Sequence, residues 1–221
     1  MAYVDFISSI HKSTTRDYIK RVTDHDKAVI AENAIRFDRE YWDGERHEGY
    51  GGYRYDGRWR VMAEALVRHY KLKEDARILD IGCGKGFLLY DFLQVLPKAQ
   101  VVGIDISQYA IDNAKPEVKP FLQVGPASKL PFGDREFDLV VSINTLHNLQ
   151  LPELWAALEE MERVGKGTAK HLVVEAYRTE REKVNLMYWQ LTCRAFHTPD
   201  EWEWLFEQTG YRGDHSFIYF E

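Results

Sequence analysis

Cysteine is scarce in this sequence: its 221 residues include two, Cys83 and Cys193. Two distant cysteines offer neither a disulfide framework nor the spacing of a zinc site, so we predict no metal and a reducing, cytoplasmic setting. The chain also lacks a run of about 18 uncharged apolar residues, and it begins without an apolar stretch of signal-peptide length. We therefore predict a protein that is not secreted and has no membrane partner.

An excess of positive charge is also missing. The 29 Lys and Arg residues stand against 35 Asp and Glu residues, which gives a net charge of −6. Proteins that neutralise many phosphates carry a basic surface, so this balance argues against a nucleic acid partner. The composition, 45% hydrophobic and 29% charged, is that of an ordinary globular protein. The length allows one α/β domain with a small attached element.

The pattern of the chain changes near residue 76. In residues 1–75, mixed apolar and charged spacing predicts surface helices over 13–22 and 26–37, and helical spacing returns over 58–70. Between them, residues 38–59 are rich in both aromatic residues and glycine. Glycine at this density disfavours a helix and permits tight turns. We therefore predict a helical segment built around an aromatic and glycine-rich lid.

From residue 76 to 221, apolar strand patterns alternate with helical patterns. The expected strands lie at 76–81, 100–105, 121–125, 137–143, 171–177 and 216–220. The expected helices lie at 87–96, 107–115, 153–164 and from Thr198 to Gly210. Strands without polar alternation, separated by helices, are typical of a parallel sheet covered on both faces. The sequence predicts an α/β fold: a Rossmann-like, doubly wound, mostly parallel sheet flanked by helices.

Three glycines lie in the segment ILDIGCGKG, residues 78–86, between a predicted strand and a predicted helix. At such a loop the backbone can approach a nucleotide cofactor closely. A dinucleotide fingerprint needs a third glycine where this sequence has Phe87, which weakens the case for a pyrophosphate. Asp105 ends the second predicted strand 23 residues after Gly82. This is close to the usual offset for an acid that accepts hydrogen bonds from ribose hydroxyls.

These motifs, together with VVGIDIS, PASKLPF and FDLVVSINTLHNL, resemble class I S-adenosylmethionine-dependent methyltransferases over residues 76–177. The whole chain is similar to uncharacterised bacterial members that act on small molecules. The resemblance implies S-adenosyl-L-methionine as the cofactor, with Asp80 and the glycines along its methionine part, Asp105 on the ribose and Ile106 against the adenine. The full set of implied cofactor contacts is Asp80, Gly82, Cys83, Gly84, Gly86, Asp105, Ile106, Ala127, Ser128 and Asn144.

The sequence departs from that family's pattern at two places. The acid that often follows the third strand is replaced by Pro126, which shifts the expected adenine contact to the Ala127 backbone and Ser128. After Gly210 there is room for one terminal strand, so we expect the antiparallel hairpin of the family to be shortened. Cys83 fits a small packing residue better than a reactive thiol.

Methyl transfer from a sulfonium needs alignment and the exclusion of water, and it needs a base only when the acceptor must lose a proton. His147, after the fourth strand, is the first candidate base, although a structural histidine bonded to a local carbonyl fits the sequence equally well. Glu175 and Tyr177, at the end of the fifth strand, are second candidates for orienting an acceptor. Glu175 fits a structural acid equally well.

The segment 50–59 is the predicted lid, because its aromatic rings tolerate the positive charge of a sulfonium and exclude water. Arg54 and Arg58 are suited to hold a carboxylate or phosphate of the acceptor. The full set of predicted acceptor contacts is Tyr53, Arg54, Tyr55, Arg58, Trp189 and His197. Simple packing of the N-terminal helices on the sheet explains the aromatic residues equally well.

The sequence thus predicts an S-adenosylmethionine-dependent methyltransferase with a small-molecule acceptor, such as an anionic metabolite or a surface-carbohydrate precursor. Two alternatives remain: a nicotinamide-dependent oxidoreductase and a non-catalytic cofactor-binding module. Phe87 and the lack of a Tyr-x-x-x-Lys pair speak against the first. Phe217 and Tyr219, which we expect to be exposed, are compatible with a homodimer.

Overall fold

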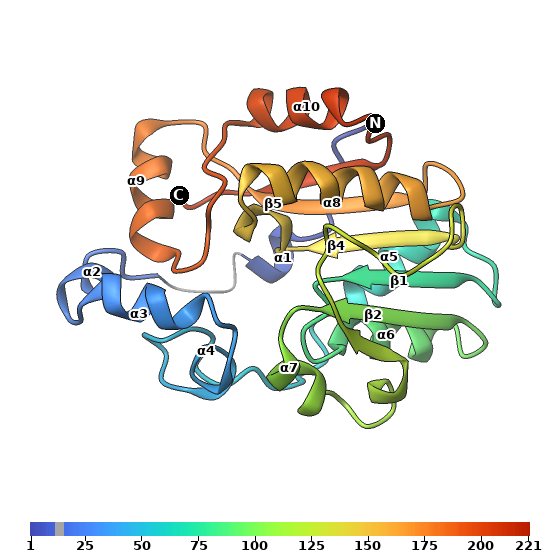
Figure 1. Ribbon diagram of the computed structural model, residues 1–221, viewed down its shortest axis with the longest axis horizontal. Coiled ribbons are helices and arrows are strands. Elements are labelled where there is room, and N and C mark those ends of the chain that lie inside the picture. Colours follow the sequence, from blue (N-terminus) through green and yellow to red (C-terminus); the bar gives the residue numbers. More distant parts are fainter. Residues whose placement is uncertain (12–15) are drawn as a thin grey trace.

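A parallel sheet forms the centre of the computed structural model, which describes residues 1–11 and 16–221. Its six strands follow the order β3-β2-β1-β4-β5-β6, and every neighbouring pair runs parallel (Figure 1). The strands are β1 (Arg77–Ile81), β2 (Gln100–Asp105), β3 (Leu122–Val124), β4 (Leu139–Ile143), β5 (Lys170–Glu175) and β6 (Asp214–Ile218). The predicted Rossmann-like α/β fold is confirmed.

The central strands are apolar because helices cover both of their faces. Strand β4, with the sequence LVVSI, is buried at every position. On one face the core includes Leu66 of α5 (Arg60–Tyr70) and Phe92 of α6 (Phe87–Val95). On the other face it includes Leu158 of α8 (Leu151–Val164) and Trp202 of α10 (Pro199–Gln208). Burial on both sides removes the polar alternation of a half-exposed strand.

Short elements connect the strands and were predicted in part. Helix α7 (Gln108–Asp112) begins after Ser107, whose hydroxyl accepts from the Ala110 backbone N–H as an N-cap. Helix α10 begins with the capping box that Thr198 and Glu201 predict. Two 3-10 turns, η1 (Lys119–Phe121) and η2 (Leu146–Asn148), precede β3 and follow β4.

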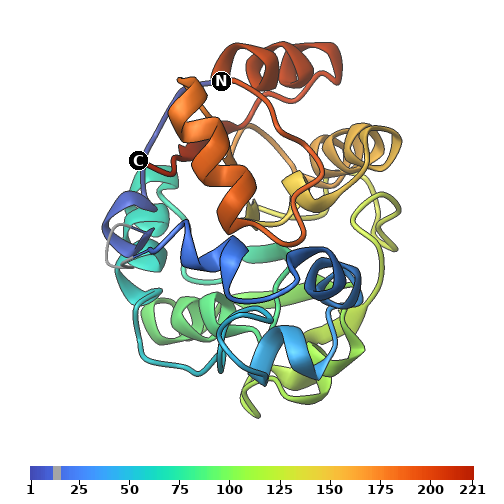
Figure 2. The same ribbon diagram turned by 90° about the vertical axis from the view of Figure 1, so that its left-hand side faces the viewer.

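The N-terminal helices lie on the side of the molecule toward which the strands point (Figures 1 and 2). They are α1 (Ser8–His11), α2 (Lys20–Thr23), α3 (Lys27–Ala34) and α4 (Arg39–Asp43), and α9 (Glu180–Trp189) lies beside them. Residues 13–15 of the helix expected over 13–22 lie outside the described residues, and the described part is helical only from Lys20. These elements cover the edge of the sheet at which the strands end.

Two helices differ from the sequence prediction. Helix α4 forms inside the glycine-rich segment, because it uses only the residues before Gly44, its C-cap. Helix α9 lies in residues 178–197, where we predicted no element. Its first turn is capped by Thr179, whose hydroxyl accepts from the Glu182 backbone N–H. A short cap and two acids in the first turn were its sequence signal.

The far edge of the sheet also differs from the prediction. Strand β6 is parallel to β5, and the described residues contain no antiparallel strand beside it. The N-terminus continues the sheet instead: Val4 N–H donates to the His215 carbonyl at 2.8 Å. Phe217 is therefore buried, with 3% of its surface exposed, and its expected exposure, on which the case for a homodimer partly depended, is wrong. Tyr219 is half-buried.

Within the described ranges, no helix is both long enough and apolar enough to cross a lipid bilayer.

Candidate active site

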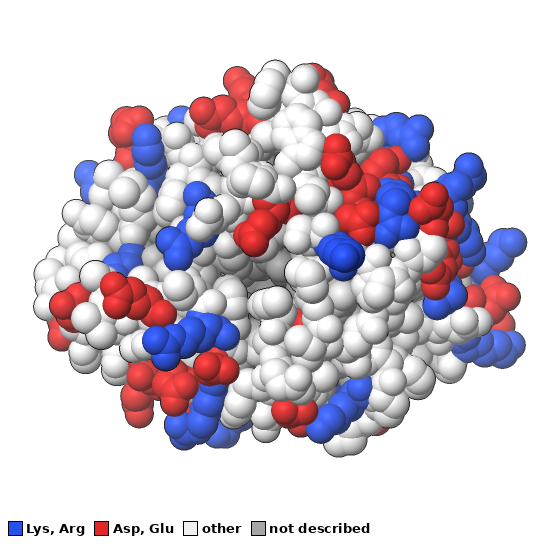
Figure 3. Space-filling view, viewed as in Figure 1, with Lys and Arg blue, Asp and Glu red and all other residues white. Residues whose placement is uncertain are grey.

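A cavity of about 690 Å³ lies at the carboxyl ends of the strands, where the strand order changes direction between β1 and β4. Open parallel sheets bind ligands at this switch point. The N-terminal elements and the segment after α9 form its opposite wall. Figure 3 shows the surface hollowed near the middle of the face that is turned to the viewer in Figure 1.

The glycine loop between β1 and α6 forms one wall of the cavity. Gly82 and Gly84 adopt φ angles of 79° and 53°, which favour glycine. A Cβ on Gly82 would lie 2.1 Å from the Thr145 hydroxyl oxygen, and one on Gly84 would lie 2.9 Å from the Trp42 ring. Gly86 is the N-cap of α6 and does not line the cavity. The first two glycines therefore let Thr145 and Trp42 pack directly against the backbone of the loop.

Asp105 fixes the same loop from the end of β2. One carboxylate oxygen accepts from the Gly84 backbone N–H at 2.7 Å, and the other accepts from the Ser107 backbone N–H at 2.8 Å. Burial raises the pKa of Asp105, and these hydrogen bonds oppose that shift. Asp105 also lines the cavity. Beside it, the Ile106 side chain is 57% exposed and offers an apolar surface, bordered by Ala127 and Ser128.

Aromatic rings from residues 42–53 cover the glycine loop. The Trp42 indole N–H lies within hydrogen-bond distance of the Ser107 hydroxyl (2.9 Å) and the Phe37 carbonyl (3.0 Å), which holds the ring against α7. The Tyr50 ring stacks on Trp42 with centroids 5.3 Å apart, and Tyr53 stacks on Phe87 at 4.8 Å. The aromatic rings that pack over the loop thus begin at Trp42, before the segment 50–59 for which the lid was predicted.

Glu175, at the end of β5, lines another part of the cavity. Its side chain is 1% exposed, and burial raises the pKa of its carboxyl to about 8. The Gln190 amide donates to Oε1. Oε2 has no hydrogen-bond partner among the described residues, and His147 Nε2 lies 3.5 Å from it. A buried carboxyl group that is neutral near pH 7 therefore faces this part of the cavity.

His147, the first candidate base, does not line the cavity. Its Nδ1 accepts from the Glu175 backbone N–H at 3.3 Å, and its backbone carbonyl accepts from the N–H groups of Arg194 and Ala195. Burial lowers the pKa of the His147 imidazole to about 3. The ring is therefore neutral, with its proton on Nε2, and it contacts Glu175 rather than the cavity.

The structure brings most of the predicted contacts to one cavity. Those that line it are Gly82, Cys83, Gly84, Asp105, Ile106, Ala127, Ser128, Asn144, Tyr53, Arg54, Arg58, Trp189 and Glu175. Those that do not are Asp80, Gly86, Tyr55, His147, Tyr177 and His197. Asp80 is buried beside Asp105, and burial raises its pKa to about 8. The Tyr55 hydroxyl donates to Asp91 at 2.7 Å, and the His197 ring packs on Trp202.

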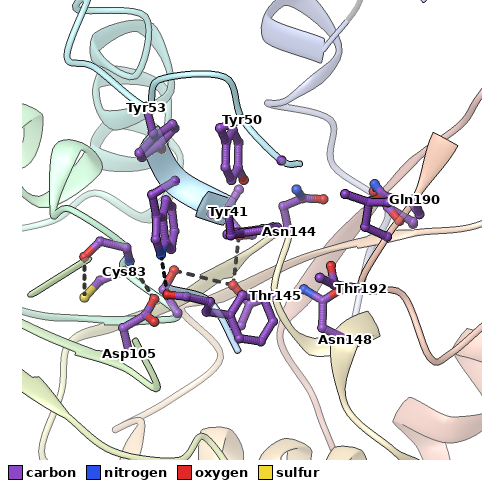
Figure 4. Close-up of a pocket in the computed structure, with 18 of the residues that line it drawn as sticks. Tyr41, Tyr50, Tyr53, Cys83, Asp105, Asn144, Thr145, Asn148, Gln190 and Thr192 are labelled. Atoms are coloured by element: carbon purple, nitrogen blue, oxygen red, sulfur yellow. Dashed lines mark hydrogen bonds between the residues drawn. The ribbon is translucent and has the colours of Figure 1, made fainter. Parts of the chain in front are cut away.

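Sequence reasoning missed several residues of the cavity wall. They are Arg16, Arg21, Tyr41, Trp42, Arg46, Thr145, Asn148, Gln190 and Thr192. Figure 4 shows part of this set between Asp105 and Cys83 on one side and Gln190 and Thr192 on the other. Most come from segments without a motif, so only the density of aromatic and arginine residues before residue 60 could have indicated them. In the described residues, no group of three His, Cys, Asp or Glu side chains is placed to hold a metal ion.

Comparison with known proteins gives a family match over the part of the chain that holds the glycine loop. Residues 78–167 match the model of a family described as a methyltransferase domain. The chain is 35% identical to an uncharacterized methyltransferase of Schizosaccharomyces pombe, over 49% of this chain and 43% of that protein. It is 30% identical to a demethylmenaquinone methyltransferase of Symbiobacterium thermophilum, over 66% of this chain and 61% of that protein. The chain therefore spans about half the length of these relatives.

Solved structures share the fold at lower identity. The YcgJ protein of Bacillus subtilis is 23% identical, with a TM-score of 0.57 over 66% of both chains. A geranyl diphosphate methyltransferase solved in complex with SAM is 15% identical, with a TM-score of 0.57 over 68% of this chain and 64% of that chain. These likenesses support the Rossmann-like fold.

Proposed function

We propose that the chain is an S-adenosylmethionine-dependent methyltransferase acting on a small molecule, because residues 78–167 match the methyltransferase domain family. The family match confirms the resemblance that the glycine loop and the acid after the second strand predicted. The observation that carries the proposal is that this loop and Asp105 line one cavity at the switch point of the sheet.

The residues at this end of the cavity fit S-adenosyl-L-methionine. Gly82 and Gly84 bring the loop backbone to the cavity wall, where it would lie along the methionine chain, and the Asp105 carboxylate at the same wall would accept from the ribose hydroxyls. Ile106 offers the adenine an apolar face, with Ala127 and Ser128 at its rim. When bound, the cofactor supplies a methyl group already activated as a sulfonium. The protein therefore has to align the acceptor and exclude water, and the closed aromatic lid serves the second task.

The size of the cavity supports a small acceptor. Its volume of about 690 Å³ lies within the range of small-molecule sites, and the lid covers its glycine-loop end. Related proteins act on different acceptors, because one is named a demethylmenaquinone methyltransferase and another a malonyl-[acyl-carrier protein] O-methyltransferase. The acceptor of this chain therefore has to be inferred from its own cavity wall.

Within this proposal, Glu175 takes the role first considered for His147. Only Glu175 lines the cavity, and its elevated pKa suits exchange of a proton with an acceptor near neutral pH. His147 Nε2 lies 3.5 Å from Glu175 Oε2, and within this proposal His147 is a positioning residue.

Calorimetric titration with S-adenosylhomocysteine, with NAD as the control ligand, tests the proposed function. We expect saturable binding of the first and none of the second. Asp105→Ala should weaken that binding by about 1–3 kcal/mol, because it removes charge-assisted bonds to the ribose. Glu153→Ala removes another carboxylate from the cavity wall and serves as the matched control. Binding of NAD alone would reject the methyltransferase, and unchanged affinity in Asp105→Ala would reject the ribose contact.

A further inference from the structure

Three arginine side chains surround one aromatic ring in the cavity wall. The guanidinium carbons of Arg16, Arg21 and Arg46 lie 5.4, 5.2 and 5.3 Å from the centre of the Trp189 ring. All four residues line the cavity, and Gln190, which follows Trp189, holds Glu175. In Figure 4, Gln190 lies across the cavity from Asp105. The arginines therefore gather on the acceptor side of the proposed site.

Backbone carbonyls hold the side chains of Arg21 and Arg46 in place. Arg21 donates from Nε to the Trp189 carbonyl at 3.1 Å, and from Nη1 to the carbonyls of Arg46 and His47 at 2.9 and 3.0 Å. Arg46 donates from Nη1 to the Gly49 carbonyl at 2.5 Å. These bonds join α2, the lid and the end of α9. They fix the positions of the guanidinium groups without neutralising their charge.

No carboxylate of the described residues compensates the positive charges of Arg21 and Arg46. Among the described residues, the hydrogen bonds that Arg21 and Arg46 donate go to backbone carbonyls and none goes to an acidic side chain. Glu175 is the buried acid on this side of the cavity, and it is mostly neutral at pH 7 because burial raises its pKa to about 8. Burial and the neighbouring Arg46 lower the pKa of Arg21 to about 10. Two guanidinium groups that are held close together and partly desolvated repel each other, and binding of an anion relieves this repulsion.

We propose that Arg21 and Arg46, supported by Arg16 and Trp189, form an anion subsite for a carboxylate or phosphate group of the methyl acceptor. Guanidinium groups bind both kinds of oxyanion through paired N–H donors, and the aromatic face keeps them oriented. This inference rests on the proposed methyltransferase function and names the chemistry of its acceptor.

The assignment differs from the one that the sequence favoured. Arg58 was the predicted anion ligand together with Arg54, but its Nε donates to both oxygens of Asp56, at 3.0 and 2.8 Å. That pairing raises the pKa of Arg58 and compensates its charge. Arg58 lines the same cavity, which makes it a matched control for Arg21 and Arg46.

The test measures the binding of two simple anions to the full chain saturated with S-adenosylhomocysteine. Inorganic phosphate is followed by phosphorus NMR and succinate by saturation-transfer proton NMR. We expect saturable binding of at least one of them, and the better of the two distinguishes a phosphate from a carboxylate acceptor. Arg21→Gln and Arg46→Gln should each weaken this binding by about tenfold or more, whereas Arg58→Gln should leave it within about twofold.

Each variant is also titrated with S-adenosylhomocysteine. Unchanged affinity shows that the fold and the cofactor end are intact, and Arg46→Gln is the safer variant because its side chain is exposed. If neither anion binds the wild-type chain saturably, the subsite is rejected. Equal loss of binding in Arg58→Gln and in Arg46→Gln would reject it as well. Failure of the proposed function appears separately, as absence of S-adenosylhomocysteine binding in the wild-type chain.

Discussion

At the scale of single residues, Glu175 is the group whose environment departs most from that of an ordinary carboxylate. It ends a fully buried strand, it lines the cavity, and Oε2 lacks a hydrogen-bond donor among the described residues. The neighbouring His147 is neutral and contributes no positive charge. Desolvation therefore dominates, and the proton stays on Glu175 to a higher pH than usual.

We predict that the Glu175 carboxyl titrates near pH 8. Carbon-13 NMR of protein labelled in its glutamate side chains measures this directly, and Glu175→Gln identifies the signal by removing it. Once an acceptor is found, the rate of methyl transfer should rise as the pH rises through about 8, because only the deprotonated carboxylate accepts a proton. Glu175→Gln should lower the rate about 10²-fold and flatten that profile. Titration near 4.5 would contradict the role.

At the scale of elements, the site depends on contact between the glycine loop and the lid. The loop belongs to the sheet, whereas Trp42 and Tyr53 belong to the N-terminal segment, and they meet at Gly84. Trp42 is buried and also bonded to Ser107 at the start of α7. A change of one methyl group at this contact is therefore enough to separate two elements.

Gly84→Ala tests that contact. Its Cβ would lie 2.9 Å from the Trp42 ring at a backbone φ of 53°, so the lid must shift or the loop must strain. We expect S-adenosylhomocysteine to bind about tenfold more weakly, equivalent to about 1.4 kcal/mol. Gly167→Ala is the control, because its Cβ would meet no atom within 4 Å. Equal affinity of the two variants in calorimetry would show that lid and loop are independent.

At the scale of the whole molecule, four buried titratable groups bear on stability in opposite directions. Burial raises the pKa of Asp80 and of Glu175 to about 8, from ordinary values of 3.8 and 4.5. It lowers the pKa of His147 and of His171 to about 3, from 6.5. The folded state thus binds more protons than the unfolded state at the acids, and fewer at the histidines.

We predict that these groups place the maximum of stability between about pH 4.5 and 6.5. Above that range the two carboxyl groups are ionised in the unfolded chain and still protonated in the folded chain, so the stability falls as the pH rises toward 8. Below that range the two histidines are protonated in the unfolded chain and neutral in the folded chain, so the stability falls as the pH drops toward 3. Urea unfolding across this range measures the curve.

The Asp80→Asn variant isolates one of the two acids. The fall in stability between pH 6.5 and 8 should become shallower by at most about 1.4 kcal/mol for each pH unit, the value for one proton. The acid side of the curve should keep its slope, because both histidines remain. An unaltered fall above pH 6.5 would show that Asp80 ionises normally in the folded chain.

Much of the fold follows from local pattern. The strand sequences ILDI and LVVSI are mostly apolar and show no regular polar alternation. They therefore predict a sheet covered on both faces without information from the remainder of the chain. Glycine at positions 82 and 84 and an acid at 105 likewise predict a cofactor loop, because their requirements are set by a few neighbouring residues. The sequence by itself therefore determined the α/β fold, and it placed the glycine loop and Asp105 at one end of the sheet.

Only the tertiary structure decided which side chains share the acceptor end. Arg21, Arg46 and Trp189 come from segments that are distant in the chain, and no spacing relates them. The same limit explains His147: its position after β4 is correct, but burial behind Glu175 depends on η2 and on the backbone of residues 194–195. Burial and charge pairing arise from packing between elements, and a linear pattern contains neither.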